Sequence, residues 1–111
     1  VDEALAAYET LAAAAPDDGA IQEAYAELLL SRRDAASLEK AMVKWRELEK
    51  RSPQGSPRWF RAKYAIAWLH CQSGNKQQTA KMITLLKLLH PDLGGPEMKA
   101  RFDDLLARCR P

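Results

Sequence analysis

The feature that most constrains the fold is a spacing that recurs three times along the chain: a small residue, a large one four positions later, Leu three further on, and Pro after five more. The clearest copy consists of Ala41, Trp45, Leu48 and Pro53. The same classes stand 37 positions earlier, between Ala4 and Pro16, and 38 positions later, between Thr79 and Pro91. A period in the thirties with helical spacing inside each copy predicts stacked pairs of helices.

Breakers between the helical stretches set the number of elements. Pro16, the SPQGSP segment at 52–57, the Ser73–Asn75 turn and the HPDLGGP segment at 90–96 cannot continue a helix. We therefore expect an all-α fold of about six helices, at residues 2–15, 19–33, 37–51, 57–72, 76–89 and 96–108. Asp17 or Asp18 is expected to cap the second helix and Ser37 the third.

At the recurring positions the sequence resembles the tetratricopeptide repeat family, whose second helix has Ala and a large residue at this spacing and ends at Pro. Lys63 falls on the family's aromatic position unless Tyr64 takes it with a one-residue change in the turn. The resemblance implies a right-handed α-solenoid of antiparallel helix pairs. It divides the single domain, residues 1–111, into a second helix (1–16), two repeats (17–53 and 54–91) and a C-terminal capping helix (95–110).

Composition and charge narrow the class of partner. The chain is 47% hydrophobic and 29% charged and has no low-complexity tract, so all of it is expected to fold. No apolar run approaches the roughly 20 residues of a membrane span. The 17 basic and 15 acidic residues are interleaved and give a net charge of +2, which predicts no nucleic-acid partner.

The two cysteines are 38 residues apart, which is the repeat distance. Cys71 and Cys109 should therefore occupy equivalent places on neighbouring helices, whose axes normally lie about 8 to 10 Å apart. That separation exceeds ordinary disulfide reach. We expect two unpaired thiols, which favours a reducing compartment such as the cytoplasm.

Residues for catalysis, metal binding or a cofactor are not apparent in the sequence. His70 and His90 have no ligand-like spacing to a second His, Cys or carboxylate cluster. His70 and Cys71 are neighbours on an expected helix and point about 100° apart, which does not suit a nucleophile pair. The Gly94-Gly95 pair lacks the Lys and the spacing of a phosphate loop. The sequence therefore indicates a non-enzyme without cofactor.

An alternative function comes from one local motif. The stretch from Leu88 resembles the J-domain of DnaJ-like co-chaperones, with the tripeptide His90-Pro91-Asp92 between a helix that carries lysines and a helix that contains Phe102. This resemblance implies stimulation of a chaperone ATPase through the tripeptide. The structural alternative is that His suits a helix C-terminus, Pro ends the helix and Asp caps the next one.

The repeat interpretation predicts a module that binds a protein or peptide and performs no chemistry. Repeat stacks expose a concave face, lined mainly by the first helix of each pair, on which partner segments bind. With a 38-residue period, we expect this face to include Arg61, Tyr64, Trp68, Lys99 and Phe102. If Tyr64 is the core aromatic of its unit, Trp68 also turns inward and the aromatic row is packing.

The first expected helix is the second helix of a pair and has no partner before it in this sequence. Leu5, Tyr8 and Leu11 give it an apolar face. Repeat stacks need polar caps to stay soluble. We therefore expect further repeats upstream in a longer protein, or self-association through this helix, whereas the polar last helix can serve as a closing cap.

The repeat leads to a first prediction about Ala41 and Trp45. Both should be buried, because the recurring positions are those at which helices meet closely. Trp45→Ala should lower the free energy of unfolding by about 3 to 5 kcal/mol, measured by chemical denaturation. An unchanged midpoint would mean that the spacing is coincidental.

Overall fold

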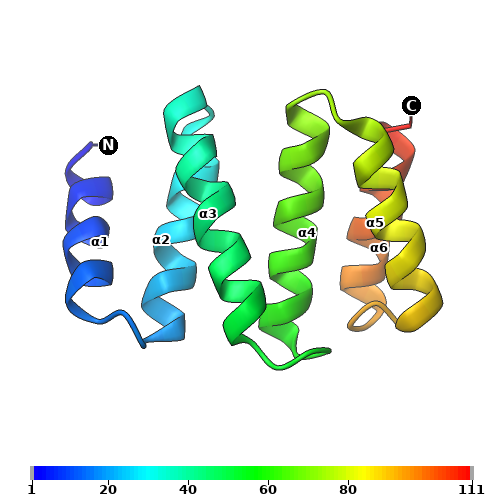
Figure 1. Cartoon of the computed structure of the whole chain (residues 1–111), viewed down its shortest axis with the longest axis horizontal. Coiled ribbons are helices and arrows are strands. Elements are labelled where there is room, and N and C mark those ends of the chain that lie inside the picture. The colour runs from blue at the N-terminus through cyan, green and yellow to red at the C-terminus, as the bar shows by residue number, and fades with distance from the viewer. Residues whose placement is uncertain (1, 111) are drawn as a thin grey trace. The chain divides into compact units, whose positions relative to one another are not determined.

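The computed structural model describes residues 2–110, and these residues form helices and connecting turns without any strand. The helices are α1 (Asp2–Ala14), α2 (Gly19–Arg32), α3 (Ala35–Arg51), α4 (Pro57–Gln72), α5 (Lys76–Leu89) and α6 (Pro96–Arg108), drawn in Figure 1. The predicted all-α fold is therefore confirmed, and every helix boundary lies within two residues of its expected place. The chain divides into two compact units, one ending at Leu48 and the other beginning at Glu49, so the division falls within α3.

Side-chain caps explain where the helices of the first unit begin. Asp18 caps α2 as predicted, since its Oδ1 accepts a hydrogen bond from the Ile21 N–H at 3.2 Å. The predicted cap Ser37 is wrong. Asp34 performs that role, because its Oδ2 accepts from the Ser37 N–H at 3.0 Å and α3 starts at Ala35. Hydrogen bonds from the backbone and then the hydroxyl of Ser37 lower the pKa of Asp34.

In the first unit, α1 packs against α2 and a buried glutamine holds the end of α1. Nε2 of Gln22 donates to the carbonyls of Ala12, at 2.9 Å, and Ala15, at 3.1 Å, which satisfies acceptors that a helix end leaves without intrahelical donors. Oε1 of Gln22 accepts from Nζ of Lys44 on α3 at 3.2 Å. The same ammonium group lies 5.8 Å from the ring centre of Tyr25. Lys44 of α3 therefore contacts α2 through both a hydrogen bond and a cation–π interaction.

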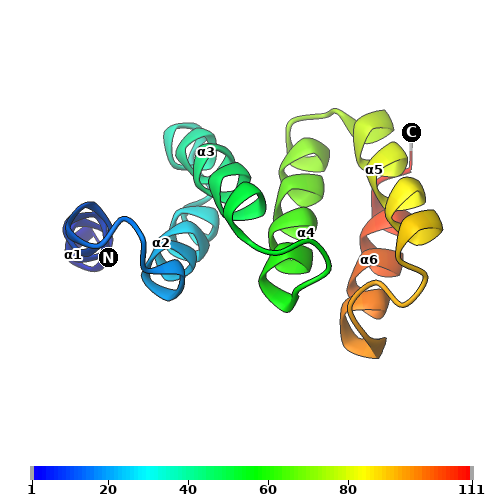
Figure 2. The ribbon, with the colours of Figure 1, turned by 60° about the horizontal axis from the view of Figure 1, so that its bottom comes forward.

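In the second unit, α4 packs against α5 and α6, and α5 packs against α6 (Figures 1 and 2). Phe60, near the start of α4, lies against Gly94, just before α6. Cys71, near the end of α4, is joined to Cys109, just after α6. Corresponding ends of α4 and α6 are thus together, so the two helices run parallel.

The parallel pair keeps the predicted 38-residue register. Tyr64 and Phe102 are 38 positions apart, and their rings meet edge to face with centres 5.5 Å apart. Cys71 and Cys109 have the same separation. Equivalent residues of α4 and α6 therefore lie side by side, as the sequence period predicts for the first helices of successive pairs. The core of the unit consists of Trp59, Phe60, Ala67, Ile83, Leu86, Leu93, Phe102, Leu105 and Cys109.

The expectation of two unpaired thiols is wrong, because Cys71 and Cys109 form a disulfide. Their Cα atoms are 5.8 Å apart, which is an ordinary disulfide separation. The distance between helix axes misled the prediction, since facing side chains reach inward from both axes. Cys109 also lies one residue past α6, where the backbone leaves helical geometry (φ −112°, ψ 35°). The preference for a reducing compartment rested on free thiols and loses its basis.

The expected burial of Ala41 and Trp45 is confirmed, whereas Ala4, Tyr8 and Leu11, at the equivalent positions of the first copy, are exposed. Ala41 is fully buried and Trp45 is 2% exposed. Equivalent positions in the next copy, Thr79 and Ile83, are also fully buried. Within residues 2–110, no helix is both long enough and apolar enough to cross a membrane.

The disulfide should stabilise the second unit by restricting its unfolded chain. For two cysteines 38 residues apart, the chain-entropy relation gives a contribution of about 3 to 4 kcal/mol. Cys71→Ala should therefore lower the free energy of unfolding of the second unit by about that amount under oxidising conditions. A dithiol reductant should destabilise the unaltered chain similarly and leave the Cys71→Ala variant unchanged. Equal destabilisation of both proteins by the reductant would contradict this account.

Candidate functional site

The rotational setting of α5 determines which of its leucines reach the surface. Thr79, Ile83 and Leu86 form its buried stripe. Oγ1 of the fully buried Thr79 donates to the carbonyl of Ala67 in α4 at 2.9 Å. The same hydroxyl lies 3.4 Å from the Asn75 carbonyl, and its shorter hydrogen bond to Ala67 links α5 to α4.

Three leucines of α5 lie on the side away from this stripe. Leu85 is 56% exposed, Leu88 75% and Leu89 61%. Their spacing of i, i+3 and i+4 places them together on one face of the helix. We call these three residues the leucine face. Exposed lone hydrophobic residues are ordinary, but three large ones on adjacent turns indicate a contact surface.

A small hollow adjoins the leucine face between α4 and α5. It has a volume of about 180 Å³, and its lining includes Trp59, Met82, Leu85 and Leu89. Lys63 stands at its edge, with Nζ 5.2 Å from the centre of the Trp59 ring. The hollow extends the apolar surface of the leucine face toward α4 and gives it a basic border.

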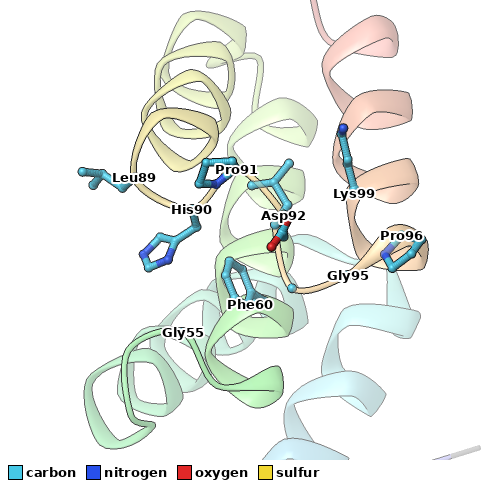
Figure 3. A pocket seen from close by; sticks show the side chains of 11 residues that line it. Gly55, Phe60, Leu89, His90, Pro91, Asp92, Gly95, Pro96 and Lys99 are labelled. Atoms are coloured by element: carbon cyan, nitrogen blue, oxygen red, sulfur yellow. The ribbon is translucent and has the colours of Figure 1, made fainter.

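A larger hollow of about 850 Å³ lies beside the connection from α5 to α6 (Figure 3). Leu89 belongs to its lining as well as to that of the smaller hollow. The remaining lining residues are Gly55, Phe60, His90, Pro91, Asp92, Leu93, Gly94, Gly95, Pro96 and Lys99. The leucine face is therefore continuous with two depressions in the surface of the second unit.

The tripeptide of the co-chaperone alternative lies in this connection, and its first residue is engaged in packing. The ring of His90 meets the rings of Trp59 and Phe60 edge to face, with centres 5.1 and 5.4 Å away. Its Nε2 is buried and has no hydrogen-bond partner among residues 2–110. Pro91 and Asp92 are exposed. The structure therefore separates a half-buried His90 from the two residues that follow it.

The next two residues of the connection, Leu93 and Gly94, complete the core beside Phe60, and we call them the plug. Leu93 is fully buried although its backbone is left-handed (φ 50°). Gly94 follows, also left-handed (φ 86°), and lies flat against Phe60. A Cβ on Gly94 would come within 2.8 Å of Cδ2 of Phe60, so only glycine fits without a shift. The HPDLGG segment thus has a structural role that needs no partner.

The aromatic residues predicted for the concave face lie in the core or pack against it. Phe102 is fully buried and belongs to the core, so its prediction as a partner contact is wrong. Tyr64 and Trp68 are half-buried and pack against the same core. The Arg101 guanidinium lies 4.3 Å from the centre of the Tyr64 ring. The aromatic row therefore serves packing within the second unit.

The two remaining predicted contacts, Arg61 and Lys99, do not join this aromatic row into one site. Arg61 is half-buried and Lys99 is exposed. Lys99 lines the larger hollow, whereas Arg61 lines another depression, beside the start of α6.

Charge is distributed unevenly along the chain, which the overall balance of +2 conceals. From Ser52 to Gly95 the sequence contains six Lys and Arg residues and a single acidic residue, Asp92. Three of these basic residues, Lys76, Lys81 and Lys87, lie on α5. Lys87 pairs with Asp103 of α6, with Nζ and Oδ1 2.5 Å apart. Lys81 is exposed and leaves the surroundings of the leucine face positive.

Among the described residues, no group of three or more His, Cys, Asp or Glu side chains could hold a metal ion. The sequence did contain a signal for the leucine face. Four leucines in LLKLL, at 85–89, are more than one buried stripe can accommodate, and only Leu86 belongs to the stripe.

Comparisons of the chain with family models, with curated proteins and with solved structures find no match.

The plug generates a prediction with a matched control. Gly94 and Gly74 both have φ of 86°, but a Cβ on Gly74 would meet nothing within 4 Å. Both Gly→Ala variants carry the left-handed strain of about 1 kcal/mol. Gly94→Ala should lose about 1 to 3 kcal/mol more, because its methyl group would press on Phe60. Equal losses in thermal or chemical unfolding would show that the contact with Phe60 carries no energy.

Proposed function

We propose that this chain is a non-catalytic protein–protein interaction module that binds a helix or peptide of a partner on the leucine face of α5. The observation that carries the proposal is the exposure of Leu85, Leu88 and Leu89 on one side of a helix whose opposite side is anchored in the core. Apolar residues at i, i+3 and i+4 are the anchors by which helices recognise one another's faces and grooves.

The basic residues around the leucine face favour a partner that carries acidic residues. Lys81 precedes the leucine face by one turn and is exposed, and Lys63 borders the adjoining hollow. Lys63 is held by Glu49, with Nζ and Oε1 2.6 Å apart, and so contributes less to the external field. With no acidic residue between Ser52 and Pro91, complementarity favours a partner that combines apolar anchors with carboxylates.

The proposal keeps the predicted class of site, a surface that binds a protein or peptide, but places it on α5 and not on the predicted concave face. Its aromatic members are occupied by packing, as described above, and the exposed apolar area lies on α5, the second helix of its expected pair. The co-chaperone alternative has less support. Its tripeptide would have to act as one exposed unit, whereas His90 is held between Trp59 and Phe60.

A direct test uses an acidic helical peptide as the probe, with leucines at i, i+3 and i+4 and a sequence unrelated to this chain. Titration into isotope-labelled protein should shift the amide resonances of residues 81–90. Leu88→Glu should weaken binding about tenfold or more, as truncation of a central anchor does. The matched control is Val43→Glu, because Val43 is 57% exposed, about as much as Leu85 at 56%, but belongs to α3 and not to the leucine face.

Binding should survive in the Val43→Glu protein with an affinity within about twofold of the unaltered chain. Shifts centred on Tyr64, Trp68 and Lys99 would restore the concave-face hypothesis and remove the leucine face. The absence of any saturable shift would contradict the proposed function.

A further inference from the structure

We infer that the partner helix for the leucine face is α1 of a second copy of this chain, so that copies associate head to tail. This inference rests on the proposed function, because it names the occupant of the same surface. Three properties of α1 and α5 carry it: their charges, their exposed apolar residues and the sizes of those residues.

The charges of the two helices are opposite and unmixed. The α1 sequence, DEALAAYETLAAA, contains three acidic residues and no basic one. The α5 sequence, KQQTAKMITLLKLL, contains three lysines and no acidic residue. Two helices of opposite sign attract each other, whereas two copies of α1 or two copies of α5 would repel. Lys87 is paired with Asp103 and Glu9 interacts with Tyr25, so Glu3 of α1 and Lys76 and Lys81 of α5 are the exposed charges that favour a contact between unlike helices.

Both helices also expose apolar residues that their own units do not cover. In α1, Tyr8 is 37% and Leu11 48% exposed, and the inward side of the helix is marked by the buried Ala12. Tyr8 and Leu11 are three residues apart and share a face. The two exposed faces are thus of the same kind, one at the acidic end of the chain and one in its basic part.

The sizes of the residues on the two faces are complementary. Ala4 and Ala7 lie on the same side of α1 as Leu11 and are exposed. Small residues on one helix leave room for large ones on another, as ridges of side chains fill grooves. The three leucines of the leucine face are the large residues that such a groove accepts. Alanines alone would indicate nothing, but here they adjoin exposed Tyr8 and Leu11 on a helix of the matching charge.

The environment of Glu9 shows which side of α1 is already used. Burial raises the pKa of Tyr25 on α2, and the Glu9 carboxylate raises it further. Glu9 therefore faces α2 within the unit. Ala4, Ala7 and Leu11 lie on another side of α1 and are exposed.

A contact between two different surfaces of identical chains is heterologous and does not close by itself. It should therefore extend to open chains of molecules as concentration rises. A single pair of helices buries less area than a standard stable interface, so we expect micromolar or weaker affinity. Because opposite charges drive it, the association should weaken as salt rises from about 50 to about 500 mM.

The test is complementation between two full-length variants, measured by sedimentation velocity. Leu88→Glu places a negative charge on the leucine face and leaves α1 intact. Leu11→Lys places a positive charge on the α1 face and leaves α5 intact. Both positions are exposed, at 75% and 48%, so both proteins should fold, which circular dichroism verifies.

The unaltered chain should show a weight-average mass that rises with concentration. Each variant alone should remain monomeric at concentrations where the unaltered chain associates. An equimolar mixture should form a one-to-one dimer, because the intact α1 of the Leu88→Glu protein can bind the intact α5 of the Leu11→Lys protein. The Val43→Glu protein should associate as the unaltered chain does.

Each other outcome overturns the inference. Association of the Leu11→Lys protein alone would indicate pairing of α5 with α5, and association of the Leu88→Glu protein alone would indicate pairing of α1 with α1. A monomeric unaltered chain, or a mixture that stays monomeric, would remove the second copy as occupant. If the acidic probe peptide still binds in that case, the proposed function stands and only its occupant is wrong.

Discussion

The packing of α5 against α4 is the constraint on which the surface of the second unit depends. The Thr79 hydroxyl must reach the Ala67 carbonyl, and Ile83 and Leu86 must enter the core. A rotation of α5 that buried the leucine face would bring Ile83 and Leu86 out of the core and break the hydrogen bond from Thr79 to the Ala67 carbonyl. The exposure of three leucines is therefore imposed by the interior, and the chain tolerates it at the surface.

The two ends of α6 reinforce that arrangement. At its start, Leu93 fills the core and Gly94 lies against Phe60 near the beginning of α4. Beyond its last residue, Cys109 is joined to Cys71 near the end of α4. With both ends of α6 attached to α4, α5 is held by packing against two helices that cannot separate easily. The disulfide and the plug thus stabilise the position of α5 through its neighbours α4 and α6.

Much of this fold could be predicted from the sequence, because Pro and Gly mark the helix ends and the helical spacing marks the buried stripe. The 38-residue register also held, since Tyr64 meets Phe102 and Cys71 meets Cys109. The disulfide was missed because a period gives equivalence between positions but not the distance between side chains. Asp34 was missed as a cap because Ser37 offered an equally good hydroxyl, and only the backbone geometry distinguishes them.

The site was harder to predict than the fold, for a physical reason. A surface residue and a core residue of an amphipathic helix can be the same amino acid. The residue type alone therefore does not show whether a leucine is buried or exposed. Phe102 was assigned to the surface by its ladder position, yet it lies on the inward stripe of α6 with Leu105.

The HPDLGG segment illustrates the converse error. Its similarity to a functional motif is explained by a separate structural role for each residue. His90 fills a gap between aromatic rings, Pro91 follows the end of α5, and Leu93 and Gly94 close the core.

Charge supplies the information that hydrophobicity lacks. The part of the chain up to Leu48 has ten acidic and five basic residues, whereas the part from Glu49 onward has five acidic and twelve basic ones. A net charge near zero therefore conceals two units of opposite sign. Long-range attraction between unlike units speeds encounter and disfavours pairing of like with like. Apolar faces of similar size would by themselves permit any pairing of α1 and α5, so it is this separation of charge that gives an association of copies its direction.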